Sequence, residues 1–330
     1  MLAHSLLALL TLITSSLAAP TAPSSHIPLI IWHGLGDNYA ADGLASVAKL
    51  AEKINPGTFV YPIRLAEDAG SDRTATWYGN LTEQMQYVCD DLASHKILSK
   101  ASAVNALGFS QGGQFLRGYI ERCNNPPVRN LVTFGSQHSG ISSFQRCKTG
   151  DWLCQSAAAL LRNNAFGSFA QGRLVPAQYY RSLNITTGRP TVEYLENSNF
   201  LADVNNEREE KNVTYKENIA ALENFVSFMF GNDTTVVPRE SAWFADVLVE
   251  DPSTGVNRTI IPLNETRPYK EDWLGLRKLD EKGALKFETH PGGHMELDEE
   301  ILEKVFKKYF GPAKQNGLTV QNVIEKLWEL

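Results

Sequence analysis

The chain has 330 residues, of which 43% are hydrophobic and 21% are charged. This composition is typical of a globular protein with a sizeable core and argues against a disordered chain. The formal net charge is −6 and the sequence pI is about 5.7, with no long basic stripe. These values exclude nucleic acid and anionic membrane surfaces as expected partners.

The N-terminus has the pattern of a secretory signal peptide. Residues 6–13 form an apolar run, and the small residues after it suit cleavage near Ala18 or Ala19. The run is shorter than the roughly 20 residues that a transmembrane helix needs. We therefore expect residues 1–19 to be a cleaved signal peptide, and we expect no stable membrane span in the rest of the chain.

Six Asn-x-Ser/Thr sequons fit a protein that enters the secretory pathway. Their asparagines are Asn80, Asn184, Asn212, Asn232, Asn257 and Asn264. Together they predict a lumenal or secreted glycoprotein, although not every sequon needs to be occupied.

The four cysteines predict two disulfides, because an even number of cysteines in an oxidising compartment normally pairs. Three pairings are formally possible. The favoured one joins Cys147 with Cys154 across a local loop and Cys89 with Cys123 between two helices. No Cys-x-x-Cys or His-Cys cluster is present, so the sequence predicts no metal site.

Apolar strand-like segments alternate with segments of helical periodicity along most of the chain. Strands are expected over 27–32, 58–61, 103–107, 130–134, 226–230 and 283–289, and helices over 43–53, 81–98, 111–122 and 299–309. Such alternation predicts an α/β fold in which helices cover both faces of a mostly parallel sheet. We expect residues 20–330 to form a single domain.

The alternation lapses between about residues 139 and 218, where the sequence is polar and includes a charged run over residues 207–211. We interpret this stretch as an insertion between core strands. It can form a wall of the substrate site or a plain surface elaboration. Residues 311–330 form a C-terminal extension.

The strongest motif is Gly-x-Ser-x-Gly, in which Gly108 and Gly112 flank Ser110. An apolar strand precedes it and a segment of helical periodicity follows it, which is the setting of a nucleophile elbow. The glycines remove side chains that would collide in the sharp turn. The motif therefore predicts that Ser110 is the nucleophile of a serine hydrolase.

A serine nucleophile needs a base and an acid that orients the base, and in this type of fold the chain order is Ser, Asp or Glu, then His. His294 lies in a glycine-rich loop after the last expected strand, whereas His290 lies nearer the strand end and is expected to pack structurally. Asp233 follows the strand over residues 226–230. The expected triad is therefore Ser110, Asp233 and His294.

An oxyanion hole needs backbone N–H groups from the residue after the nucleophile and from a loop after an early strand. Gln111 fills the first position and Leu35, between two glycines, fills the second. His33 in the same loop is expected to shape the loop and not to act as a base.

Five segments share motifs with one known family. They are residues 32–37, 108–113, 135–140, 232–234 and 293–294. Taken together they resemble the palmitoyl-protein thioesterase family, most closely its lysosomal type-one members, and the resemblance extends from about residue 28 to residue 310.

This resemblance implies an α/β-hydrolase fold and release of long-chain acyl groups from S-acylated proteins or peptides and other long-chain acyl thioesters. It implies an acyl-enzyme intermediate, no cofactor, and delivery to a lysosome or vacuole, with secretion as the other possible destination. The resemblance assigns the nucleophile, acid and base to Ser110, Asp233 and His294, and the oxyanion N–H groups to Leu35 and Gln111. It also supports both favoured disulfides.

Two other readings stay open. A secreted lipase or carboxylesterase on the same fold would act on oxygen esters, because a triad alone does not select sulfur. A catalytically silent binding glycoprotein is the other reading. Four insertion residues are candidates for an acyl groove or for plain core: Phe166, Phe169, Leu174 and Tyr179.

Overall fold

Six parallel strands form the central sheet, in the order β2-β1-β3-β4-β5-β8. The computed structural model describes residues 26–143, 149–150, 152–251 and 256–311. The strands are β1 (Leu29–Trp32), β2 (Val60–Pro62), β3 (Val104–Phe109), β4 (Val128–Phe134), β5 (Asn224–Phe230) and β8 (Leu285–His290). All six expected strands are present, and their ends differ from the expected ones by no more than two residues.

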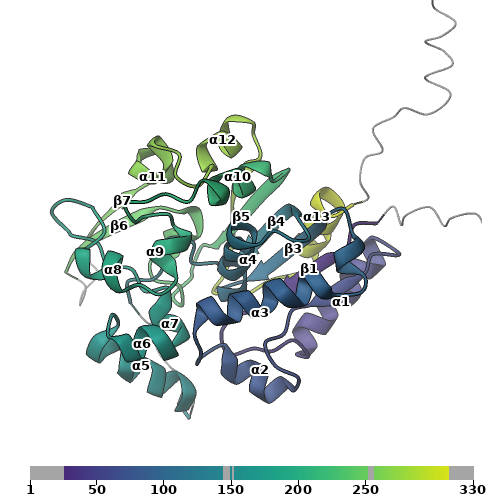
Figure 1. Cartoon of the computed structure of the whole chain (residues 1–330), viewed down its shortest axis with the longest axis horizontal. Coiled ribbons are helices and arrows are strands. Elements are labelled where there is room, and N and C mark those ends of the chain that lie inside the picture. The colour runs from purple at the N-terminus through teal and green to yellow at the C-terminus, as the bar shows by residue number, and fades with distance from the viewer. Residues whose placement is uncertain (1–25, 144–148, 151, 252–255, 312–330) are drawn as a thin grey trace, which may run out of the picture.

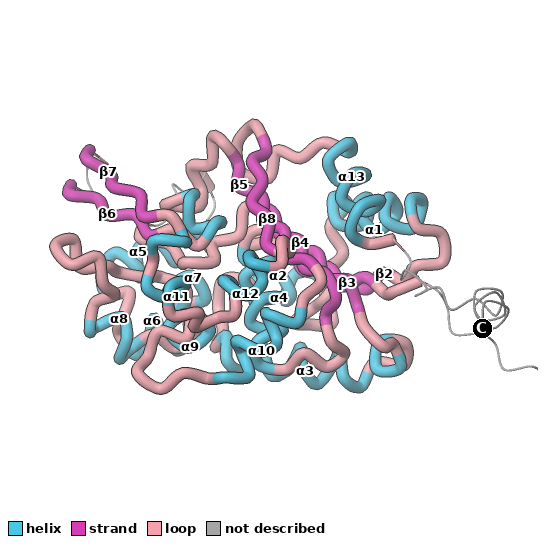
Figure 2. The backbone as a smooth tube through the Cα atoms, turned by 90° about the horizontal axis from the view of Figure 1, so that it is seen from above, coloured by secondary structure: helices cyan, strands magenta, loops and turns pink. Residues whose placement is uncertain are grey.

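Helices cover both faces of this sheet, which confirms the predicted architecture (Figure 2). The face that carries Leu29 and Ile31 packs against α1 (Asp42–Ile54) and α13 (Glu299–Tyr309). The opposite face, which carries Ile30 and Trp32, is covered by α3 (Leu81–Ser94), α4 (Gln111–Arg122), α10 (Val213–Ala221) and α12 (Leu276–Glu281). Alternate residues of one strand therefore enter two different apolar layers.

The helix α13 shows why these segments fold as they do. Its buried residues Leu302, Val305, Phe306 and Tyr309 follow helical spacing and form one apolar stripe. The Asp298 side chain caps the helix by accepting a hydrogen bond from the Ile301 N–H at 2.8 Å. The stripe packs on the sheet, and the polar side faces solvent.

In its described residues, the predicted insertion contains five helices between β4 and α10. They are α5 (Trp152–Asn164), α6 (Ser168–Arg173), α7 (Val175–Gln178), α8 (Val192–Asn197) and α9 (Leu201–Val204). An antiparallel hairpin of β6 (Asp246–Asp251) and β7 (Val256–Ile261), which the sequence analysis did not foresee, lies at the same end of the molecule (Figures 1 and 2). The remaining short helices are α2 (Ala69–Ala75) and α11 (Arg267–Lys270).

A buried arginine on α4 joins the sheet layer to the insertion. The Arg117 guanidinium donates to the Glu121 carboxylate at 2.7 Å, to the Asn205 side chain at 2.7 Å and to the His138 carbonyl oxygen at 3.0 Å. Burial raises the pKa of Glu121 to about 7, although the charge of Arg117 acts in the opposite direction. The charged group thus fixes α4 against two separate segments.

A second buried arginine, Arg181, joins the insertion to the hairpin. It forms ion pairs with Glu207 at 2.6 Å and with Asp246 of β6 at 2.5 Å, and the Tyr194 hydroxyl also donates to Glu207 at 2.6 Å. Glu207 belongs to the charged run over residues 207–211 that the sequence presents as polar surface. It is nevertheless buried, because a cation distant in sequence compensates its charge.

The expected disulfide between Cys89 and Cys123 is present and ties α3 to the end of α4, with 6.0 Å between the two Cα atoms. The other expected pair includes Cys147, which lies outside the described residues, whereas Cys154 is buried. The expected signal peptide and residues 312–330 also lie outside them. In the part of the chain that is described, no helix has the length and apolar character needed to cross a membrane.

Replacing Cys89 and Cys123 together by alanine is expected to lower the free energy of unfolding by about 2–4 kcal/mol. The bond joins residues that are 34 positions apart. Without it, the unfolded chain gains conformational entropy, which stabilises the unfolded state relative to the folded one. Urea unfolding of the variant and of the wild type measures the difference. Equal unfolding midpoints for the two proteins would contradict a stabilising role for this disulfide.

Candidate active site

Ser110 lies in the sharp turn between β3 and α4, with φ 50° and ψ −122°. This left-handed backbone is unfavourable for a residue with a side chain. The neighbouring glycines allow it: a Cβ on Gly108 would lie 2.2 Å from the Gly113 Cα, and a Cβ on Gly112 would lie 2.3 Å from the Trp32 carbonyl oxygen. The turn therefore has the geometry of a nucleophile elbow.

The structure brings Ser110, His294 and Asp233 together in one hydrogen-bonded chain. His294 Nε2 lies 2.9 Å from Ser110 Oγ, and His294 Nδ1 lies 2.7 Å from Asp233 Oδ2. A carboxylate can only accept, so Nδ1 carries the proton and Nε2 is left to accept the proton of the serine hydroxyl. The three residues come from three separate strand ends, those of β3, β5 and β8.

The Asp233 carboxylate is held by its own turn. Its other oxygen accepts hydrogen bonds from the N–H groups of Thr235 at 2.8 Å and Val236 at 3.0 Å. The side chain is only 2% exposed. Because both oxygens have partners, the carboxylate has a fixed orientation toward His294.

The loop that carries His294 is fixed at both sides of the histidine. The Gly293 N–H donates to the Glu296 carboxylate at 2.7 Å, and the Asn232 N–H donates to the Gly292 carbonyl oxygen at 2.9 Å. The imidazole meets the ring of Phe230 nearly edge to face, with 5.9 Å between the ring centroids. These contacts join the histidine loop to the turn that carries the aspartate.

The two expected oxyanion residues both lie close to Ser110. Gln111 begins α4, so its N–H is among the first four that have no acceptor within the helix. The loop with Leu35 approaches closely, because a Cβ on Gly34 would lie 3.2 Å from the Ser110 Cβ. This arrangement can present two N–H groups to one oxygen atom at Ser110.

Asp72 of α2 anchors the Leu35 loop, a role that the sequence analysis missed. Its carboxylate accepts hydrogen bonds from the N–H groups of Leu65 at 2.6 Å and Tyr39 at 2.9 Å, and it lies 2.9 Å from His33 Nε2. Burial raises the pKa of Asp72, but the hydrogen bonds of His33, Leu65 and Tyr39 and the nearby His33 charge outweigh burial, so the net pKa is lowered.

Thr76 supports the same loop and was also missed. Its hydroxyl accepts a hydrogen bond from the Gly36 N–H at 2.8 Å, and its carbonyl oxygen accepts one from the Gln111 side chain at 3.3 Å. Neither Asp72 nor Thr76 lies in a recognisable motif. Only the fold brings them to a loop 33–40 residues away in the chain.

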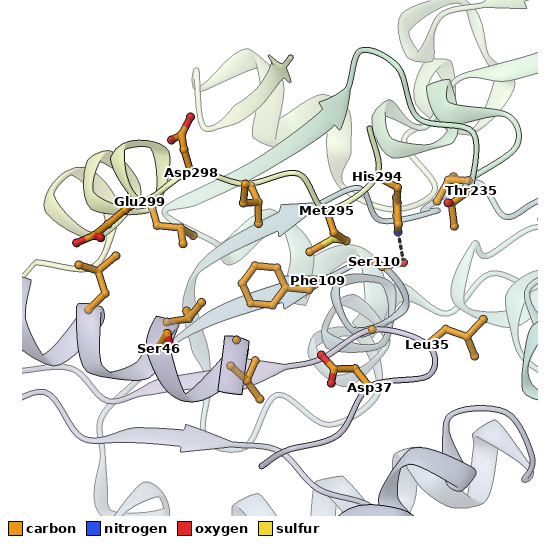
Figure 3. A pocket seen from close by; sticks show the side chains of 18 of the residues that line it. Leu35, Asp37, Ser46, Phe109, Ser110, Thr235, His294, Met295, Asp298 and Glu299 are labelled. Carbon is orange, nitrogen blue, oxygen red and sulfur yellow. Dashed lines mark hydrogen bonds between the residues drawn. The ribbon is translucent and has the colours of Figure 1, made fainter. Parts of the chain in front are cut away.

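A cavity of about 910 Å³ opens at Ser110 and His294. Figure 3 shows these two side chains at one side of it, with Met295 and Phe109 beside them. Among the insertion candidates, Tyr179 lines the cavity and donates a hydrogen bond to the Gln111 side chain at 3.1 Å. Phe166 and Leu174 are buried elsewhere in the core, and Phe169 is 65% exposed.

The family model described as palmitoyl protein thioesterase matches residues 28–294. The chain belongs to this family. "Palmitoyl-protein thioesterase 1" of Caenorhabditis elegans is 37% identical over 92% of this chain and 98% of that protein. A Schizosaccharomyces pombe protein, "Palmitoyl-protein thioesterase-dolichyl pyrophosphate phosphatase fusion 1", is 33% identical over 91% of this chain and 46% of its own length. "Lysosomal thioesterase PPT2 homolog" of Drosophila melanogaster is 26% identical over 81% of this chain and 85% of that protein.

The other predicted residues of this thioesterase-family chain lie outside the hydrogen-bonded triad. His290 ends β8, is buried and contacts Phe230 edge to face. Asn80 is half-buried and caps α3, whereas the other sequon asparagines are exposed: Asn184, Asn212, Asn232, Asn257 and Asn264. No group of three or more potential metal ligands occurs within residues 26–143, 149–150, 152–251 and 256–311.

Replacing Asp72 by asparagine is expected to lower kcat about 10–100-fold, because the Leu35 loop loses its anchor and the oxyanion donors shift. The free energy of unfolding should also fall by about 1–3 kcal/mol. Asp68→Asn is the matched control: Asp68 caps the same helix by accepting from the Ser71 N–H, and asparagine caps equally well.

The stability difference between wild type and Asp72→Asn should also depend on pH. Because the folded-state pKa of Asp72 lies below its unfolded value, the stabilisation is complete above the ordinary pKa of about 3.9 and is lost as the pH falls through the lower folded value. Urea unfolding should therefore give a constant difference between about pH 7 and pH 5 and a smaller one below about pH 4. A difference that grows on acidification would contradict the assignment.

Proposed function

We propose that this protein is a serine thioesterase that releases long-chain fatty acyl groups, palmitoyl among them, from the cysteines of S-acylated proteins or peptides. The observation that carries the proposal is the chain of hydrogen bonds from Ser110 through His294 to Asp233 at the cavity, in a member of the palmitoyl-protein thioesterase family. No cofactor is needed for this chemistry.

In the first half of the reaction, Ser110 Oγ attacks the thioester carbonyl carbon while His294 Nε2 removes the hydroxyl proton. The Asp233 carboxylate keeps Nδ1 protonated and stabilises the imidazolium that forms. The backbone N–H groups of Leu35 and Gln111 bind the negative oxygen of the tetrahedral intermediate. In comparable sites, one such donor contributes roughly 10²–10³ in rate.

In the second half, the tetrahedral intermediate collapses: the carbon–sulfur bond breaks, the leaving cysteine sulfur takes the proton from His294 Nε2, and the acyl group stays on Ser110. The ordinary pKa of a cysteine thiol is about 8.5, so the thiolate needs less protonation by His294 than an alkoxide or an amine does. His294, neutral again, then takes a proton from a water molecule as the water attacks the acyl ester, and it returns that proton to Ser110 Oγ as the fatty acid leaves.

The proposed place of action is the lumen of the secretory pathway, with delivery to a lysosome or vacuole or with secretion. The signal-like N-terminus and the exposed sequons support entry into that pathway. A disulfide between Cys89 and Cys123 suits an oxidising compartment. Relatives with the word lysosomal in their names support the lysosomal destination.

Hydrolysis of matched palmitoyl thioester and palmitoyl oxygen-ester substrates by the purified glycoprotein tests this proposal, with Ser110→Ala as the control. We expect the thioester to be cleaved with the higher kcat/KM and both activities to vanish in Ser110→Ala. Preference for the oxygen ester would favour a lipase or carboxylesterase instead. Activity that survives in Ser110→Ala would contradict the proposed nucleophile.

Replacing Asp233 by asparagine is expected to lower kcat by roughly 10⁴-fold, because the amide selects the wrong tautomer of His294. Substrate binding should change far less, since Asp233 acts on the imidazole and not on the substrate. Steady-state kinetics on the palmitoyl thioester separates kcat from KM. A loss confined to KM would argue that Asp233 serves binding and does not orient the base.

A further inference from the structure

One edge of the central sheet is an open strand. In the part of the chain that the structure describes, β8 is the last strand of the sheet and pairs with β5 on one side only. The carbonyl oxygens of Ala284 and His290, at the two ends of β8, accept hydrogen bonds from the β5 side, each at 2.9 Å. Because hydrogen-bonding groups alternate along a strand, the even-numbered residues of β8 face β5.

The odd-numbered residues Leu285, Phe287 and Thr289 therefore direct their N–H and C=O groups away from the sheet. Among the described residues, no other backbone group bonds to them. Unpaired groups along a strand edge are a template for pairing with another strand. The opposite edge of the sheet is a poorer template, since β2 has only three residues and ends in Pro62.

We propose that two copies of this protein pair through β8 in antiparallel orientation, about a two-fold axis at Phe287, so that their two six-stranded sheets join into one. The backbone defines this register. In an antiparallel pair, two residues whose outward groups face each other exchange both N–H···O bonds. An axis at Phe287 makes this residue its own partner and pairs Leu285 with Thr289, so all three residues with outward groups are used.

The same register places opposite charges opposite each other. Lys286 of one copy faces Glu288 of the other, and the two-fold axis repeats this contact. These two positions form non-hydrogen-bonded pairs, whose Cα atoms lie only about 4.5 Å apart. Glu288 is exposed, and Lys286 Nζ donates to Asn224 Oδ1 at 2.8 Å and to the Gly283 carbonyl oxygen at 2.9 Å. One N–H of the lysine therefore remains for the carboxylate of the second copy.

The charges also select this register over its neighbours. An axis at Lys286 or at Glu288 would keep odd-numbered residues opposite one another, so the backbone alone would allow it. The first would place Lys286 against Lys286, and the second would place Glu288 against Glu288. Like charges directly opposite each other destabilise a strand pair. A lone lysine on an edge strand opposes pairing, whereas a lysine and a glutamate two residues apart favour one self-complementary pairing.

Aromatic side chains add apolar contact on the other face of the joined strands. Phe287 is half-buried and stacks on Trp243, the last residue of the 3-10 helix Arg239–Trp243, with 5.9 Å between the ring centroids. At the axis, the Phe287 side chains of the two copies become direct cross-strand neighbours. None of the six sequons lies in β8 or α13, so no N-linked glycan is attached to the proposed interface.

Sedimentation equilibrium of the purified glycoprotein tests the dimer. We expect the wild type to dimerise at concentrations below about 0.1 mM. Lys286→Glu and Glu288→Lys should each raise the dissociation constant of the dimer at least about tenfold, because each places like charges opposite each other at two positions. The double variant should restore the wild-type value. An equimolar mixture of the two single variants should form mixed dimers that are tighter than the dimers of either variant alone.

Lys96→Glu is the matched control, because it makes the same change of charge at an exposed site that follows α3. It should leave the dissociation constant unchanged. If Lys286→Glu does not fold, Glu288→Lys decides alone, since Glu288 is exposed. A wild type that is monomeric at about 0.1 mM, or a dimer of equal stability in the wild type and Glu288→Lys, would overturn the proposal.

Amide hydrogen exchange locates the interface. The N–H groups of Phe287 and Thr289 should exchange more slowly in the dimer than in the diluted monomer, whereas those of Lys286 and Glu288, which face β5, should be protected in both. A dimer in which exchange at Phe287 and Thr289 does not depend on concentration would place the interface elsewhere. Protection of these two groups in the monomer would show that another segment of the chain covers the edge. Either result would overturn the proposal.

Discussion

The site depends on the sharp backbone turn at Ser110, which holds a side chain at positive φ where β3 ends and α4 begins. The turn exists because Gly108 packs on the backbone of Gly113 and Gly112 packs on the end of β1, with no room for a side chain at any of these contacts. The same close packing directs the start of α4 toward the cavity. The proposed nucleophile Ser110 and the proposed oxyanion donor Gln111 are therefore placed by a single constraint.

The other parts of the site come from distant segments, and each is fixed by polar contacts. Asp72 holds the Leu35 loop, the turn over residues 233–236 holds its own aspartate, and Glu296 holds the loop of His294. Arg117 on α4 and Arg181 in the insertion hold α4, the insertion and the β6–β7 hairpin together. The reaction needs the reacting groups within hydrogen-bond distance of one another. The contacts that hold these groups in place are already formed before the substrate binds.

The elements that could be predicted from the sequence are those that depend on short-range sequence patterns. The strands and α4 follow from short-range periodicity, and Ser110 follows from a motif that requires a strand before it and a helix after it. The role of Asp72 and the burial of Glu207 could not be predicted, because each depends on a partner brought near only by the folded chain. In the sequence, the charge of Glu207 indicates an exposed side chain. Arg181, which is 26 residues away in the chain, lies beside it only in the folded protein.

Detection of the acyl-enzyme intermediate is the most direct test of the proposed serine mechanism. The purified glycoprotein is mixed with a palmitoyl thioester, quenched with acid within the first turnover, digested and analysed by mass spectrometry. We expect a palmitoyl group esterified to Ser110 in the wild type and none in Ser110→Ala. Thioester cleavage with no acyl group on Ser110 at any time, or with the acyl group on another residue, would contradict it.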